Sequence, residues 1–175
     1  MLIVDKTQGG KCPLFCAIGG LWPWGTGVLQ LPARAHMMFF RLHPYLPLGS
    51  LQAALAYPAD PAAMSDDEMI DALKRTGLGH FSNSLDRSVR WERELSSDEQ
   101  TRLGLARLLL HKPRWIFSED TIDVLEEDQH DMAVSIFNRE LVKSSIVSIS
   151  RRDMPSRFYS RVLHLILRPD SVRVA

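Results

Sequence analysis

Short apolar runs recur along the chain and predict strands. Each run covers a few residues, is rich in Val, Ile, Leu, Met or Phe, and is bounded by charged or turn-forming residues. This pattern is typical of strands that are buried within a sheet. The predicted strands are residues 1–4, 27–31, 37–40, 114–118, 145–149 and 161–167.

Helices are predicted between these strands, where apolar residues recur every three or four positions. Two of them begin with a capping box, in which a serine and a Glu or Gln three residues later satisfy free N–H groups of the first turn. The first box is Ser65 with Glu68, before a helix that stops at Gly77. The second is Ser97 with Gln100. The other predicted helices are a stripe of Leu14, Ile18 and Leu21, residues 50–57 and residues 124–141.

The order of these elements predicts the fold class. Strands that alternate with helices are typical of an α/β domain with a largely parallel sheet. Residues 50–110 contain mostly helical patterns, so we expect a helical subdomain inserted within the α/β domain.

Composition narrows the class of function. Lys plus Arg equals Asp plus Glu at 21 each, and hydrophobic residues make up 45% of the chain. This balance argues against a nucleic-acid surface or a polybasic membrane tether. Cys12 and Cys16 do not make a disulfide framework, and we interpret them as small buried hydrophobic residues in a reducing, cytosolic setting.

Residues 12–32 carry no charge over about the length of a membrane span. However, this stretch contains three prolines and the turn sequence WPWGTG. A buried helix, a turn and a strand explain it better than a membrane helix. The start of the chain, MLIVDK, lacks the basic region and the long apolar run of a signal peptide. We therefore expect a cytosolic chain.

Four segments occur in order: GGKCPLFCAIGGLWPWGTG, FFRLHPYLPLGSL, WERELSSDEQTRLGLARLLLHKPRWIFSED and SIVSISRRD. Their order and spacing resemble the nucleotide-binding domain of ABC transporters, particularly half-transporters related to peroxisomal fatty-acyl exporters and bacterial peptide or vitamin transporters. The resemblance implies a P-loop NTPase (RecA-like) core, a helical insert at about residues 50–110 and an incomplete antiparallel lobe. Residues 1–175 would form one ATP-binding domain, truncated before the strand that feeds the phosphate loop.

The phosphate loop of this family reads G-x-x-x-x-G-K-[ST], and residues 5–12 of this chain read DKTQGGKC. The resemblance assigns phosphate contacts to Gly9, Gly10, Lys11 and Cys12. Asp5 replaces a glycine of the tight loop and adds negative charge near the phosphates. Cys12 replaces the hydroxyl that binds Mg²⁺ with a sulfur ligand that Mg²⁺ disfavours. Lys11 is either a phosphate clamp or a solvated lysine in a glycine-rich loop.

The family's signature, LSxGEQ, reads LSSDEQ at residues 95–100. The resemblance implies that Ser96, Asp98 and Gln100 approach nucleotide in a dimer. Asp98 removes the glycine whose backbone faces the partner's γ-phosphate. The alternative is structural. Ser96 and Gln100 would act as cap and near-cap residues at the helix start, and the negative charge of Asp98 would interact favourably with the amino end of the helix dipole.

The catalytic positions of the family are also altered. The resemblance assigns metal binding to Glu119, the role of base to Asp120 and the switch position to Arg151. The two carboxylates stand in reverse order, and the switch histidine is replaced by arginine. Leu42 replaces a glutamine, and Glu126 aligns with an aspartate. Because displacements of about 1 Å cost about a hundredfold in rate, we expect weak hydrolysis or none.

Function and partners follow from this resemblance. The first hypothesis is an ATP-binding domain of a membrane transporter, with ATP and Mg²⁺ as cofactors. Its partners would be a membrane-spanning domain or subunit and a second nucleotide-binding domain, at the cytoplasmic face of a membrane. Residues 44–50, PYLPLGS, resemble the segment that meets the membrane domain, although an ordinary proline-rich loop explains them equally well. The second hypothesis is a non-catalytic regulatory or interaction partner, or a gene fragment without function.

The remaining aromatic and imidazole side chains have structural explanations. We expect the tryptophans to be packing residues rather than platforms for a base. These tryptophans are Trp22, Trp24, Trp91 and Trp115. Five histidines lack the spacing of metal ligands, and we expect them to lie at the surface or to be hydrogen-bonded: His36, His80, His111, His130 and His164.

Overall fold

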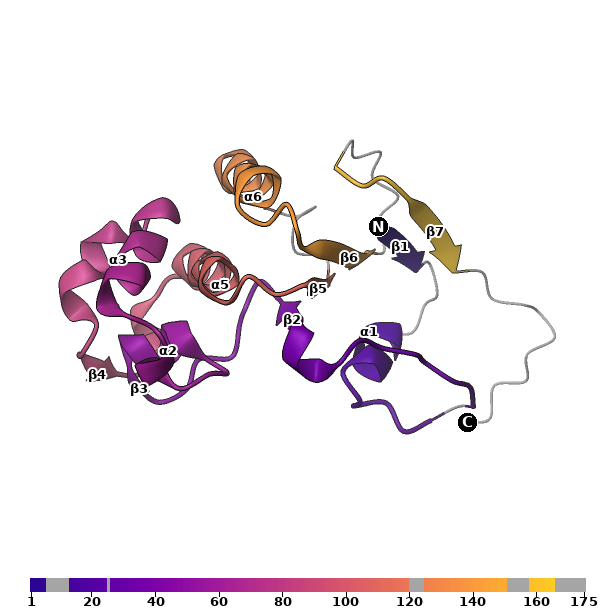
Figure 1. Ribbon diagram of the computed structural model, residues 1–175, viewed down its shortest axis with the longest axis horizontal. Coiled ribbons are helices and arrows are strands. Elements are labelled where there is room, and N and C mark those ends of the chain that lie inside the picture. Colours follow the sequence, from indigo (N-terminus) through magenta and orange to yellow (C-terminus); the bar gives the residue numbers. More distant parts are fainter. Residues whose placement is uncertain (6–12, 25, 120–124, 151–157, 166–175) are drawn as a thin grey trace.

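A parallel sheet organises the domain, as the alternation of strands and helices predicts. The computed structural model describes residues 1–5, 13–24, 26–119, 125–150 and 158–165. Its main sheet has five strands in the order β2-β5-β6-β1-β7, and every neighbouring pair is parallel (Figure 1). The strands are β1 Leu2–Asp5, β2 Met37–Phe40, β5 Trp115–Glu119, β6 Ser145–Ser150 and β7 Val162–Leu165.

Successive side chains along a strand point in opposite directions, and both directions lead to buried clusters in the part of the sheet formed by β2, β5, β6 and β1. One face contributes Ile3, Phe117 and Ile149 to a cluster with Phe15 and other residues near helix α1 (Pro13–Ile18). The other face packs against α5 (Ser97–His111) and α6 (Glu127–Arg139). Figure 1 shows α1 and α6 on opposite sides of the sheet. This two-sided burial agrees with the mostly apolar sequences of β1, β2 and β5, whereas the residues of β7 are exposed.

The helical insert forms one end of the molecule, where Figure 1 shows α2 and α3 beyond α5. It also contains a two-stranded antiparallel pair, β3 Gly49–Ser50 with β4 Ser88–Val89. The prediction of a mostly helical block at residues 50–110 is therefore confirmed. Its helices are α2 Leu51–Ala56, α3 Asp66–Arg75, α4 Trp91–Glu94 and α5, and the described 3-10 helices of the chain are η1 Arg34–His36, η2 Pro61–Ala63 and η3 Gly79–Ser84.

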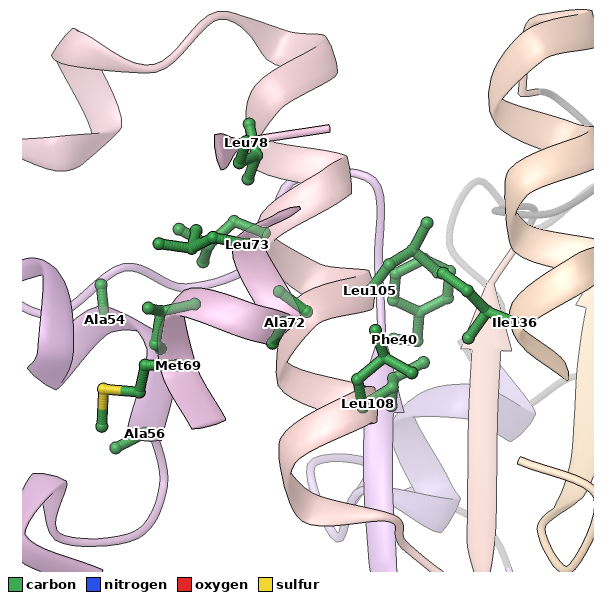
Figure 2. Close-up of a cluster of buried hydrophobic side chains, with 14 of the residues drawn as sticks. Phe40, Ala54, Ala56, Met69, Ala72, Leu73, Leu78, Leu105, Leu108 and Ile136 are labelled. Atoms are coloured by element: carbon green, nitrogen blue, oxygen red, sulfur yellow. The ribbon is translucent and has the colours of Figure 1, made fainter. Parts of the chain in front are cut away.

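Helix α5 connects the insert to the sheet. Its buried leucines belong to one hydrophobic cluster that also includes Met69 and Leu73 of the insert and Phe40 of the sheet. Figure 2 shows Leu105 and Leu108 beside Phe40 and Ile136, while Met69 and Leu73 lie on the insert side. A Cβ atom at Gly104 would lie 3.0 Å from the ring of Phe40. Glycine at this position lets α5 approach β2 closely.

The two predicted capping boxes have different outcomes. The box at Ser65 and Glu68 is present, and it begins α3. The second is wrong by one residue, because Ser96 caps α5 and Glu99 completes the box, whereas Ser97 is the first helical residue. Ser96 has the extended backbone that a capping residue needs. Both choices place a serine three residues before Glu or Gln, so the spacing alone does not separate them.

The uncharged stretch departs most from its prediction. Residues 27–31 form no strand, and Val28 is 88% exposed. No strand among the described residues runs beside them, and an isolated strand leaves its backbone groups unpaired. Leu21, predicted within a helical stripe, lies beyond α1 and is exposed. None of the described helices is long and apolar enough to span a bilayer.

The expectation that the tryptophans are packing residues holds only in part. Trp91 is buried in the insert and Trp115 is partly buried in the sheet. Trp22 and Trp24 are exposed and contact each other edge to face, with ring centroids 4.9 Å apart. Cys16, expected to be buried, is only partly so, and Cys12 lies outside the described residues.

Replacing Leu73 by alanine tests the packing of the insert. Leu73 is fully buried, and Leu→Ala at such sites costs about 2–5 kcal/mol because apolar contact is lost and a cavity remains. We expect this loss in the free energy of unfolding measured with urea. Leu48→Ala is the matched control, because Leu48 is 77% exposed and its loss is expected to stay within about 0.5 kcal/mol. Equal effects of the two substitutions would contradict the packing described.

Candidate functional site

The predicted site residues other than Ser96, Asp98 and Gln100 come at or after the ends of β1, β5 and β6 in the sequence. Because all five strands are parallel, their carboxyl ends share one edge of the sheet, where open α/β sheets bind ligands. Strand β6 lies between β1, which leads to the predicted phosphate loop, and β5, which ends at Glu119. Six predicted site residues lie outside the described residues, and their roles stay predictions: Gly9, Gly10, Lys11, Cys12, Asp120 and Arg151.

Glu119 is the described member of the predicted catalytic pair. It ends β5, and its side chain is 22% exposed. One carboxylate oxygen lies 3.0 Å from a guanidinium nitrogen of Arg41, which follows β2. The Arg41 guanidinium also lies over the ring of Phe15, 5.7 Å from its centroid. The carboxylate expected to bind metal therefore faces a cation.

Arg41 is a site residue that the sequence analysis missed. The signal lies in the register, because Phe40 pairs with Ser118 and the next residues of the two strands are Arg41 and Glu119. Sequence patterns predict both strands, but they do not state that β2 and β5 are neighbours. Knowledge of the strand order would have placed these opposite charges side by side.

The signature residues Ser96 and Gln100 have structural partners. The Ser96 hydroxyl accepts a hydrogen bond from the Glu99 N–H, and the Ser96 N–H donates to the Glu99 carboxylate. Gln100 Nε2 donates to the carbonyl oxygens of Glu92 and Leu95, which fixes the turn between α4 and α5. These contacts favour the structural interpretation of Ser96 and Gln100 as residues of the helix start.

Asp98 joins two helices at the same place. One carboxylate oxygen lies 2.8 Å from Nε of Arg102, one turn along α5, and the other accepts a hydrogen bond from Gln129 Nε2 of α6. Where the resemblance expects a glycine, this chain has a carboxylate that links α5 to α6. Gln129 is a second residue that sequence reasoning missed, because nothing local indicates this long-range contact.

The charge at the start of α5 is unfavourable for phosphate. Burial alone would raise the pKa of Glu99, but hydrogen bonds from the Ser96 N–H and hydroxyl and from His80 lower it below its usual value. Glu99 is therefore ionised at neutral pH, and it lies next to Asp98 at the end of the helix that would otherwise attract an anion. Two carboxylates already interact with this helix end.

Of the two predicted metal ligands, Glu119 is described, whereas Cys12 lies outside the described residues. Magnesium takes hard oxygen ligands in octahedral geometry. Within the described ranges, no three His, Cys, Asp or Glu side chains gather as ligands would. Glu119 offers a carboxylate, but the guanidinium of Arg41 competes with a cation for it. At this place the described residues therefore offer the carboxylate of Glu119, which is already paired with a guanidinium.

The loop after β2 is held to α5 by two side chains. Thr101 Oγ1 donates to the carbonyl of Leu42 at 3.0 Å. Arg107 Nη1 donates to the carbonyl of Tyr45 at 2.8 Å, and its Nε donates to the carbonyl of Ala54 in α2 at 2.5 Å. Burial lowers the pKa of Arg107 to about 10, so it stays protonated at neutral pH.

Near this anchor, three large side chains remain exposed: Tyr45, Leu48 and Tyr57. We call this surface the PYLP face. Tyr45 and Tyr57 contact each other with ring centroids 5.1 Å apart. Exposed apolar groups that lie close together mark interaction sites more often than isolated ones do. The segment that the sequence singled out as a partner contact therefore presents apolar surface.

In comparisons with known proteins, the chain is similar to ABC transporter proteins. No protein-family model matches it. An uncharacterized ABC transporter ATP-binding protein of Haemophilus influenzae is 32% identical over 165 residues, covering 94% of this chain and 28% of that protein. ABC transporter D family member 1 of Arabidopsis thaliana is 30% identical over 177 residues, covering 94% of this chain and 13% of that protein. The chain thus spans less than a third of these relatives.

A solved structure agrees with the fold. The structure of a bacterial Atm1-family ABC exporter with ATP bound matches with a TM-score of 0.68 at 20% identity. The match covers 86% of this chain and 29% of that chain. It confirms the predicted fold class, a RecA-like α/β core with a helical insert.

Asp98→Ala tests the link between α5 and α6. We expect it to lower the free energy of unfolding by roughly 1 kcal/mol more than Asp67→Ala does, because it removes a partly exposed ion pair and a hydrogen bond. Asp67 is the matched control, since it occupies the second helical position of α3 as Asp98 does in α5. Urea unfolding of both variants measures the difference. Equal losses would show that the contacts of Asp98 contribute nothing.

His111 gives the domain a predictable response to acid. Burial lowers its pKa from 6.5, although the carbonyls of Ala56 and Tyr57 act in the opposite direction. The unfolded chain therefore takes up a proton on acidification before the folded chain does, and stability falls as the pH drops below about 6.5. We expect His111→Gln to reduce the stability loss between pH 7.5 and 5.5 in urea unfolding. His36→Gln, at an exposed histidine, should leave that loss unchanged; the reverse result would contradict the assignment.

Proposed function

Because this chain belongs to the family of ABC transporter ATP-binding proteins, we propose that it serves as the ATP-binding domain of a membrane transporter and hydrolyses ATP weakly or not at all. The position of Asp98 is the observation that supports weak or absent hydrolysis. Its carboxylate replaces the glycine that the family pattern places opposite a partner's γ-phosphate. It is fixed there by Arg102 and by Gln129 of α6.

The carboxylate of Asp98 opposes catalysis in two ways. A negative charge next to Glu99 repels the phosphate of a nucleotide held by a second domain. Its contacts with Arg102 and Gln129 also hold it in place, so movement away from the phosphate would break both. Positioned hydrogen-bond donors and complementary charge supply much of an enzyme's rate enhancement. Here the carboxylate of Asp98, a hydrogen-bond acceptor, stands where the family pattern has the backbone of a glycine.

Glu119 supports the same conclusion. In the family pattern this position binds metal and the next residue acts as the base, which here would be Asp120. The Arg41 ion pair neutralises Glu119, and Asp120 has a shorter side chain than the glutamate it replaces. Arg151, at the switch position, cannot act as a neutral hydrogen-bonding sensor as a histidine does. The altered side-chain lengths and charges at these positions therefore add to the effect of Asp98 on hydrolysis.

Nucleotide binding is a separate question from hydrolysis. Lys11 and the backbone N–H groups of Gly9 and Gly10 would hold phosphate if residues 5–12 form the family's loop around a helix start. Cys12 would weaken Mg²⁺ binding without removing these phosphate contacts. We therefore propose that ATP binds with reduced dependence on Mg²⁺.

The proposed partners are a membrane-spanning domain or subunit, docked at the PYLP face, and a second nucleotide-binding domain. The apolar surface of Tyr45, Leu48 and Tyr57 supports the first of these partners. The location would be the cytoplasmic face of a membrane. The contacts of Asp98 also favour the alternative of a non-catalytic interaction partner, which would pair with a competent domain and contribute no chemistry.

Nucleotide titration separates these possibilities. We expect isothermal titration of the purified chain with ATP to give saturable heat, while phosphate release stays at the level of buffer. No heat and no thermal shift at millimolar ATP would remove the ATP-binding proposal and leave the interaction partner. Turnover of the unmodified chain at rates typical of enzymes, about 1 per second or more, would contradict the proposed loss of hydrolysis.

Restoring the family residues tests the cause of the loss. The variant carrying Asp5→Gly, Cys12→Ser, Asp98→Gly, Glu119→Asp and Asp120→Glu is expected to release phosphate at least about a hundredfold faster than the unmodified chain. The same variant with Lys11→Ala is the control and should lose that gain. A folded, ATP-binding variant without turnover would show that these positions do not account for the loss.

A further inference from the structure

The chain after α1 presents apolar side chains to solvent. Helix α1 ends at Ile18, and Gly20 has a φ of 75°, a left-handed conformation that turns the chain away from the helix. Residues 21–24 and 26–31 form no helix or strand, and Figure 1 shows them beyond α1, away from the insert. We call these residues the WPW segment. Its exposed large apolar residues are Leu21, Trp22, Trp24, Val28, Leu29 and Leu31.

Two side chains of the WPW segment are indoles in contact with each other. The rings of Trp22 and Trp24 pack edge to face, and Trp24 is 69% exposed. An indole combines a large apolar ring with one polar N–H, which suits it to the boundary between water and a bilayer. Exposed apolar side chains that gather in this way mark an interaction site, whereas isolated ones do not.

The chain has no net charge, but its charges are unevenly distributed. Residues 6–59 contain four Lys and Arg residues and no Asp or Glu. One of these cations, Arg34, lies beside the start of the WPW segment, because a Cβ atom built on Gly20 would be 2.9 Å from its guanidinium. Arg34 is exposed and forms no ion pair with another described residue. The apolar segment is therefore next to a cation and is not flanked by acidic residues in the sequence.

A membrane surface that contains anionic lipids complements both features at once. Its interfacial region accepts apolar and aromatic side chains, and its headgroups attract basic residues. A protein partner would have to supply a surface whose shape fits an irregular segment. A bilayer surface imposes no such fit, since its lipids rearrange around the side chains that enter it. The chemistry of the WPW segment therefore favours lipid over a protein partner.

We propose that the WPW segment inserts its apolar side chains into the surface of a membrane that contains anionic lipids, with Arg34 at the level of the headgroups. The contact is reversible, because it consists of a few apolar side chains and one basic residue. This inference goes beyond the proposed function, in which the membrane partner is a protein docked at the PYLP face. It does not involve nucleotide, so its failure and the failure of the ATP experiments are distinguishable.

Co-sedimentation of the full chain with vesicles tests the contact. One set of vesicles is phosphatidylcholine alone, and the other is phosphatidylcholine and phosphatidylserine in equal parts. We expect the chain to bind the second set at least about fivefold more tightly, because only that set adds electrostatic attraction to apolar insertion. Bromine on the acyl chains should quench the fluorescence of Trp22 and Trp24 in the bound chain, whereas Trp91 is buried within the protein.

Two matched leucines assign the apolar part of the contact. Leu21 is 78% exposed and lies in the WPW segment, whereas Leu48 is 77% exposed and lies outside it. We expect Leu21→Ser to weaken binding to the anionic vesicles at least about fivefold, because a leucine side chain no longer leaves water on binding. Leu48→Ser should leave binding unchanged. The double variant Trp22→Ser, Trp24→Ser should bind no vesicles.

Two matched arginines assign the charged part. Arg34→Gln should weaken binding to the anionic vesicles about fivefold, which is the effect of one basic residue near such a surface, and should leave binding to phosphatidylcholine unchanged. Arg139→Gln is the control, because it removes an exposed arginine from α6, far from the WPW segment in the sequence. This variant should bind both sets of vesicles as the unmodified chain does.

Four results would overturn the proposal. They are no binding to the anionic vesicles, equal binding to the two sets, equal losses in Leu21→Ser and Leu48→Ser, and binding without quenching by bromine. The last result would mean that charge alone attaches the chain. A chain that binds no vesicles but forms a dimer in sedimentation equilibrium, which the double tryptophan variant dissociates, would assign the WPW segment to self-association.

Discussion

The packing of α5 is the constraint on which the rest of the structure depends. This helix is buried on both sides, against the sheet through Gly104 and Phe40 and against the insert through its leucines. The result is one continuous hydrophobic cluster that extends from Met69 in the insert to Ile116 in the sheet. A side chain at Gly104 would push α5 away from β2, and the insert would lose its fixed position relative to the strand ends. The geometry of the candidate site therefore follows from a packing contact outside it.

The two ends of α5 also have different chemical roles. Its amino end carries the signature residues, where Ser96 caps the helix and Asp98 is held by Arg102 and Gln129. Its carboxyl half carries Arg107, which anchors the loop of the PYLP face. A rigid helix thus joins a surface suited to a partner with the place where nucleotide would be sensed. In this chain the amino end is already tied to α6, which favours a fixed arrangement over a mobile one.

Local rules in the sequence predicted most of the fold. The strands of the parallel sheet and the capping box at Ser65 depend on neighbouring residues, so pattern and spacing suffice. The second capping box was wrong by one residue because two adjacent serines satisfy the same spacing. The prediction of a strand at residues 27–31 was wrong. An alternating apolar pattern forms a strand only beside a neighbouring strand, and the local pattern does not show whether a neighbour exists.

The candidate site was less predictable than the fold. The ion pair of Arg41 with Glu119 depends on which strands are neighbours, and the contact of Gln129 with Asp98 joins two helices that are far apart in sequence. The family pattern points to Glu119 and Asp98, but it gives no indication of the side chains that contact them. In the proposed function, those partners are what separate this chain from the activity that the pattern implies.

Native-state hydrogen exchange along α5 tests the central claim most directly. If α5 joins the insert and the sheet as one unit, the slowest amides of α3, α5 and β5 exchange with the same opening free energy and the same dependence on urea. That result is expected for a single cluster that opens as a whole. Exchange of α3 and α5 through a lower-energy opening, while β5 stays protected, would show that the insert opens independently and would contradict the role assigned to α5.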